Sequence, residues 1–195
     1  MKQLAHIVTD CLINAHIIEK EEAEIYDYGL QLLLTSGTTT IVILLIGIIS
    51  QKLTLTLLFM LALVLLRRYA GGYHAQTYLH CFLISCSVYL GMLISVHFAK
   101  SFLGAKEGII LSLVTCSYLC FKGSINSEKN QKTEEQMQQR EKLTRILTCI
   151  LTSCSIILFC RGLVWQDIAW LLVYVQTVTA VGMLAEQQKR KRKRK

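Results

Sequence analysis

The sequence contains no proline among its 195 residues, and charged and aromatic residues are sparse, at 17% and 8%. Without proline, any helix break has to come from glycine, serine or threonine. The low charge accompanies 53% hydrophobic residues and a mean hydropathy of +0.44, which is unlike a soluble domain. Uncharged runs long enough to cross a bilayer account for this composition. The sequence therefore predicts an all-α, polytopic integral membrane protein with a single membrane domain over residues 1–195.

Two metal and redox motifs are also missing. There is no His-Glu-X-X-His, which argues against a zinc protease, and no Cys-X-X-Cys, which argues against a thiol-redox enzyme. Cys116 and Cys120 are four residues apart on one helix face, where a metal or redox pair is conceivable. No second cluster with zinc-like spacing accompanies them, so a packing or lipid-facing role is favoured. We predict no metal site and no cofactor.

About six apolar segments alternate with polar joints. They comprise residues 28–51, 53–66, the run that ends at 99, 108–121, 146–160 and 168–185. Three of them are short for a hydrocarbon core of about 30 Å, so four spans plus amphipathic helices remain an alternative. Residues 1–18 carry apolar side chains at helical spacing and predict an interfacial helix. The same region lacks the basic patch and apolar core of a cleavable signal.

Positive charge favours one orientation of the six segments. The net charge is +8, and residues 189–195 are all basic. If every segment crosses, Arg67 and Arg68, the polar loop 122–145 and the basic tail 186–195 lie on one side, which is the cytoplasm by the positive-inside rule. Both termini are then cytoplasmic, and the tail is attracted to anionic membrane lipids and not to nucleic acid.

The stretch from Arg67 to Cys81 separates two apolar runs and carries the candidate chemistry. It contains His74 and, seven residues later, Cys81, the base and thiol of cysteine nucleophilic catalysis. On one straight helix these side chains would lie about 10 Å apart along the axis. A nucleophile and its base need roughly 3 Å. The chain must therefore bend, or His74 must precede the helix that carries Cys81, and Gly71 with Gly72 is where the break would form.

The same stretch resembles the accessory gene regulator B (AgrB) family of membrane peptidases, which process precursors of cyclic quorum-sensing peptides. The matching residues are Arg68-Tyr69-Ala70-Gly71-Gly72-Tyr73-His74-Ala75 and then Cys81. The resemblance implies that His74 and Cys81 are the catalytic pair. It also implies cleavage of an AgrD-like precursor peptide through a Cys81 acyl-thioester, followed by cyclisation to a thiolactone or lactone. The family further suggests a homodimer, and the active site is expected at the cytoplasmic face.

The remaining site residues are assigned from chemistry alone. Gln76 can orient His74, and the Gly71 and Gly72 amides can form an oxyanion hole. Arg67 and Arg68 can hold a precursor carboxylate or act as topology and lipid anchors.

A second hypothesis of a different class is a non-catalytic small membrane transporter or assembly partner. It predicts charged or broken helices at mid-membrane, which the uncharged segment interiors lack. The polar loop 122–145 also departs from the family pattern, because the prolines expected beside the fourth segment are missing. That absence puts loop contacts with substrate in doubt but not the His74 and Cys81 pair.

The six-span arrangement places Lys52 and Gly104 outside the cell. We expect Lys52→Cys and Gly104→Cys chains in intact cells to react with a membrane-impermeant thiol reagent above the level of the unsubstituted chain. Labelling of neither position would contradict six spans.

Overall fold

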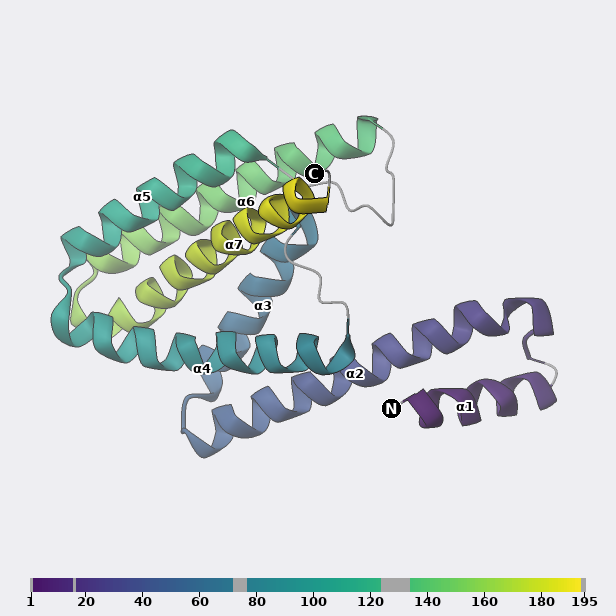
Figure 1. The fold of residues 1–195 in the computed structure, drawn as a ribbon. Helices are drawn as coiled ribbons and strands as arrows, with labels where there is room; N and C mark the ends of the chain where they lie inside the picture. The colour runs from purple at the N-terminus through teal and green to yellow at the C-terminus, as the bar shows by residue number, and fades with distance from the viewer. Residues whose placement is uncertain (1, 16, 72–76, 124–133, 194–195) are drawn as a thin grey trace. The chain divides into compact units, whose positions relative to one another are not determined.

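The computed structural model describes residues 2–15, 17–71, 77–123 and 134–193 (Figure 1). Every regular element in these ranges is a helix, which confirms the all-α prediction. The α-helices are α1 (Lys2–Asn14), α2 (Ala23–Ile49), α3 (Leu53–Ala70), α4 (Tyr78–Phe102), α5 (Ala105–Lys122), α6 (Glu134–Cys160) and α7 (Gln166–Lys193). Short 3₁₀ turns at Lys20–Glu22 and Leu163–Trp165 precede α2 and α7.

Five of these helices are long and apolar enough to cross a membrane, namely α2, α3, α4, α6 and α7. They indicate a multi-pass membrane protein. The remaining predicted segment, residues 108–121, lies in α5. This helix has 18 residues but includes Lys106, Glu107 and Lys122, which leaves a short uncharged centre. α3 is longer than its apolar run because Arg67 to Ala70 continue the helix, with both arginine side chains exposed.

Two polar segments of the sequence also form parts of helices. Residues 134–145 of the predicted polar loop form the first turns of α6, and α7 continues through the basic tail to Lys193. Glutamate, glutamine, lysine and arginine are good helix formers, so a polar composition does not stop a helix that packing has already begun.

The contacts divide the chain into two compact units, Met1–Gln51 with Ala75–Ser87, and Lys52–His74 with Val88–Lys195. Whether the chain is one membrane domain stays a prediction. In the first unit, α1 packs against α2 through Ala5 and Thr9, which are both buried. His6 Nδ1 lies 3.7 Å from Asp27 Oδ1. In the predicted apolar stripe, Ile7 is 59% exposed, whereas Ile18 after the helix is buried, and the interfacial role stays a prediction.

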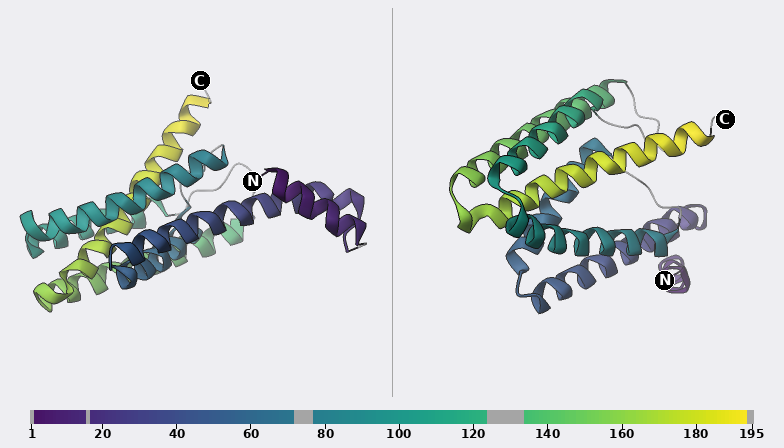
Figure 2. Two further views of the ribbon diagram at one scale, coloured as in Figure 1. Left: turned by 90° about the horizontal axis from the view of Figure 1, so that it is seen from below. Right: turned by 60° about the vertical axis from the view of Figure 1, so that its left-hand side comes forward.

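In the second unit, α7 is the central helix. It contacts α3, α5 and α6, and its residues from Ala169 to Val175 are mostly buried (Figures 1 and 2). A helix that is covered on several sides has to be apolar all round, which is why no charged residue occurs between Asp167 and Glu186.

Small residues let α5 and α6 approach closely. Gly108, Ser112 and Thr115 line the buried face of α5, and Thr152 and Ser155 belong to the buried face of α6. Close backbone approach at small residues is a main source of helix association in membranes, where burial of apolar surface gives no net gain. At Gly108 the space that a Cβ atom would need is occupied by the ring of Phe159, which is held edge-on against Trp170 with centroids 5.3 Å apart.

A buried polar cluster joins α5, α6 and α7. Gln176 of α7 is fully buried, and its Oε1 accepts hydrogen bonds from Ser112 Oγ at 3.3 Å and from Thr115 Oγ1 at 3.2 Å. Its Nε2 donates to Thr152 Oγ1 at 3.2 Å. The Ser112 and Ser155 hydroxyls are 3.0 Å apart. Each such bond between membrane helices contributes about 0.6 kcal/mol, so the cluster sets the register of three helices more than it adds stability.

Hydrogen bonds join the second half of α4 to α3 and to α7. The Thr56 and Tyr89 hydroxyls are 2.7 Å apart, and Tyr174 of α7 donates a hydrogen bond to the Val88 carbonyl at 2.8 Å. At the far end of α4, Lys100 Nζ lies 3.1 Å from Asp167 Oδ1.

Basic residues gather at the opposite end of this unit, where α3, α5 and α7 finish and α6 begins (Figure 1). They include Arg67, Arg68, Lys122, Arg140, Lys142, Arg145, Lys189, Lys191 and Arg192.

The contact at Gly108 gives a prediction with a matched control. In Gly108→Ala, the new Cβ would press on Cζ of Phe159 and come within 2.8 Å of its Cε2, so we expect destabilisation by about 1–3 kcal/mol. In Gly37→Ala on α2, no described atom lies within 4 Å, and replacing a helix glycine should stabilise by about 0.5–1 kcal/mol. Thermal unfolding in detergent measures both variants. Equal shifts in the same direction would contradict the packing of α5 on α6.

Candidate active site

α3 ends within one turn of its two arginines, at Ala70. Gly71 follows its last residue with a φ of 79°, and the Gly71 N–H donates to the Arg67 carbonyl at 3.1 Å. A positive φ favours glycine, because any side chain would strain the backbone there. Leu66 and Ala70 are buried, whereas Arg67 and Arg68 are exposed. The expected helix break at Gly71 is thus confirmed.

α4 begins at Tyr78, and Thr77 caps it. Thr77 Oγ1 accepts a hydrogen bond from the His80 N–H at 3.4 Å, and its carbonyl accepts from the Cys81 N–H at 3.1 Å. This is the arrangement of an N-cap threonine, which satisfies donors that the first turn leaves free. Cys81 therefore lies in the first turn of α4, with an exposed side chain.

The helix bounds bear on the distance that a seven-residue spacing would impose on one straight helix. Because α4 starts at Tyr78, His74 and Cys81 do not share one continuous helix, and the separation of about 10 Å along a common axis does not apply. His74, Gly72 and Gln76 lie outside the described residues. Their predicted roles as base, oxyanion donor and orienting group stay predictions.

His80 is the second imidazole near the candidate nucleophile. It is exposed and directly precedes Cys81 on α4. Neighbouring residues on a helix point about 100° apart, so the His80 and Cys81 side chains do not face each other. His80 is therefore the weaker candidate for the base and a useful control for His74.

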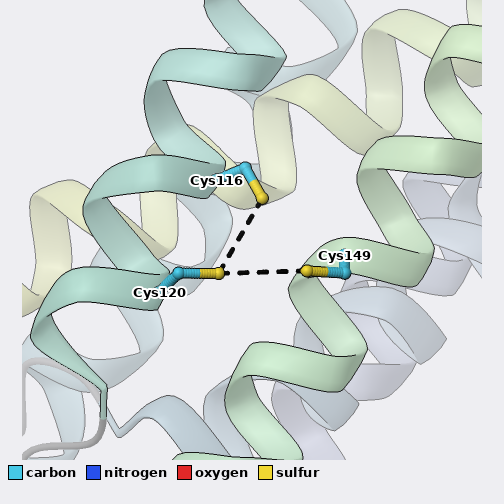
Figure 3. Close-up of side chains that lie close together, drawn as sticks. All are labelled: Cys116, Cys120 and Cys149. Atoms are coloured by element: carbon cyan, nitrogen blue, oxygen red, sulfur yellow. Dashed lines mark hydrogen bonds between the residues drawn. The ribbon is translucent and has the colours of Figure 1, made fainter.

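A second group of reactive side chains lies elsewhere in the fold. Cys116 and Cys120 of α5 face Cys149 of α6 (Figure 3), and the three sulfur atoms lie within 4.8 Å of one another. The sequence pattern identified Cys116 and Cys120 as a pair. It missed Cys149, which joins them only through the packing of α6 on α5.

Comparison with known proteins bears on the whole chain. Residues 5–183 match the family model described as accessory gene regulator B. No curated protein and no solved structure matches the chain. The match spans nearly all of α1 to α7 and includes the Arg67 to Cys81 stretch. It implies a role in processing the autoinducer of an accessory gene regulator system. This chain therefore belongs to the accessory gene regulator B family.

Proposed function

We propose that this protein is a membrane cysteine endopeptidase that cleaves a quorum-sensing propeptide and promotes its cyclisation. The observation that carries the proposal is the position of Cys81, an exposed thiol in the first turn of a helix that begins four residues after His74. The family match supports it, since the stretch that holds both residues lies within the matched region.

The reaction uses two groups in two steps. His74 takes the proton of the Cys81 thiol, and the Cys81 thiolate attacks the carbonyl carbon of the scissile peptide bond. As the C–N bond breaks, His74 gives its proton to the leaving amine, and the C-terminal fragment departs. The N-terminal part of the precursor stays on Cys81 as an acyl-thioester. At this stage His74 is neutral again and ready to act as a base.

Ring closure regenerates the enzyme. A thiol or hydroxyl of the bound precursor loses its proton to His74 and attacks the thioester carbonyl. The Cys81 sulfur leaves and takes that proton back, and the product is a thiolactone or a lactone. Exchange of one thioester for another is nearly neutral in free energy, so a thiolactone ring keeps the activation gained at cleavage. A site from which bulk water is excluded also suppresses competing hydrolysis.

The rest of the stretch has supporting roles in this proposal. The positive end of the α4 dipole favours negative charge in its first turn, where the Cys81 sulfur lies. Gly71 and Gly72 supply backbone amides for the oxyanion, and Gln76 orients the His74 ring. Arg67 and Arg68, exposed in the last turn of α3, bind a precursor carboxylate or anchor the helix end at anionic lipid.

The active site and both termini face the cytoplasm in this proposal. The basic residues at one end of the second unit support a cytoplasmic C-terminus, because the positive-inside rule assigns such an end to the cytoplasm. A ribosomally made, AgrD-like precursor would then reach Cys81 directly. The basic end of α7 adds attraction to anionic lipid or to an acidic stretch of the precursor. We also propose a homodimer, as the family suggests.

Substitution of the catalytic pair tests the proposal. The chain is co-expressed with each short open reading frame beside its gene, and the peptides are identified by mass spectrometry. We expect cleavage of one of them to vanish in Cys81→Ala and to fall by about 10²–10⁴-fold in His74→Ala, the usual contribution of a general base. His80→Ala should cleave at close to the wild-type rate.

Two outcomes of this assay would count against the assignment. Cleavage that persists in Cys81→Ala would move the nucleophile elsewhere, and no cleavage of any neighbouring peptide would favour the transporter or assembly partner. The assay also separates the roles of the arginines. A lower rate in Arg67→Ala/Arg68→Ala at unchanged membrane level indicates substrate binding, and full cleavage leaves them as anchors.

A further inference from the structure

The three cysteines between α5 and α6 converge on one point (Figure 3). The Cys120 sulfur lies 3.9 Å from that of Cys116 and 4.0 Å from that of Cys149. Cys116 and Cys120 are one helical turn apart on α5, so both reach the same side of that helix. Cys149 reaches them from α6, on which its side chain is exposed.

These separations are those of sulfur atoms around a metal ion. A metal–thiolate bond is about 2.3 Å long, so three sulfurs in a plane around one ion would be about 4.0 Å apart. Two of the three separations agree with this value, and the third, between Cys116 and Cys149, is no more than 4.8 Å. Thiols in van der Waals contact have a similar spacing, so the case for a metal site is that three thiols from two helices meet at one place. We propose that Cys116, Cys120 and Cys149 form a three-thiolate site for a soft metal ion, Cu(I).

The number and type of ligands favour Cu(I). Soft thiolates select Cu(I) and zinc among the biological metals. Among the described residues, no fourth histidine, cysteine or carboxylate joins the three cysteines. Structural zinc sites are almost always four-coordinate, whereas Cu(I) is satisfied by three sulfurs in a plane. A three-sulfur set is therefore the better match to Cu(I).

The surroundings supply charge and access. Arg145 lies one turn before Cys149 on α6, and its Nε donates to the Cys120 carbonyl at 3.1 Å. Its guanidinium also lies 3.8 Å from Glu141 Oε2, so only part of its positive charge offsets the negative charge of the three thiolates. Cys120 is about 3 Å along the helix axis from Lys122, and Cys149 is about 6 Å from Arg145. The site therefore lies close to the basic end of the second unit, within reach of ions at the membrane surface.

A bound ion would link α5 to α6 near the C-terminal end of α5, beyond the contact that their small residues make. Ser112, Ser155 and Gly108 join the two helices toward the other end of α5. Cys81 is not part of the group, so the metal site and the proposed peptidase chemistry are independent.

Cu(I) titration of the purified full-length chain tests the inference. The chain in detergent, kept reduced and anaerobic, competes with a chromophoric Cu(I) chelator. We expect one tightly bound ion per chain with three sulfur neighbours at about 2.3 Å by X-ray absorption. Loss of an orienting partner outside the metal shell weakens a site 10–100-fold, so loss of a ligand in Cys120→Ser or Cys149→Ser should weaken it at least about 100-fold.

The matched control is Cys154→Ser, which removes another exposed cysteine of α6 and should leave the tight site intact. The unfolding temperature of each variant without metal shows whether it folds, and Cu(I) should raise that temperature only where the site is complete. Equal affinity in Cys120→Ser and the unsubstituted chain would overturn the proposal. So would tight binding of Zn(II) with none of Cu(I).

Discussion

A chain that crosses a membrane must satisfy its backbone N–H and C=O groups internally, and this requirement decides where its helices can end. α3 ends at Ala70, two residues after Arg67 and Arg68, which membranes do not bury cheaply. The next helix starts at Tyr78 with its own cap from Thr77. The candidate chemistry of the protein is concentrated in and beside the segment that joins these two helices, and its place at a membrane surface stays a prediction.

The same break removes the constraint that one straight helix would place on the proposed pair. Seven residues on one helix hold a base and a nucleophile too far apart to exchange a proton. α3 ends at Ala70 and Cys81 lies on a separate helix that begins at Tyr78, so one continuous helix does not run through the stretch. Glycine at this position permits the positive φ that ends α3, and Cys81 enters the first turn of α4 with its thiol exposed.

The sequence predicted the helical class, the location of the apolar segments and the break before Cys81, since these follow from local composition and spacing. It placed the end of α3 at residue 66, because the apolar run stops there, although Arg67 and Arg68 are good helix formers. Cys149 could not be placed beside Cys120, because that contact joins residues 29 apart on two helices. The register of α6 on α5, which brings Cys149 to Cys120, follows from the contact at Gly108 and from the Gln176 cluster, whose partners lie far along the chain. The role of Gln76 and the reach of His74 stay predictions.

The most direct test of the account is to trap the acyl-enzyme on Cys81. The precursor identified by co-expression is prepared with its ring-closing cysteine or serine replaced by alanine, so that the acyl group cannot leave by cyclisation. After an acid quench, the intact mass of the chain should rise by the mass of the N-terminal part of the precursor. Peptide mapping should place the adduct on Cys81, and hydroxylamine should release it as expected of a thioester. An adduct on another residue, or a cleaved precursor with an adduct that survives in Cys81→Ala, would contradict the account.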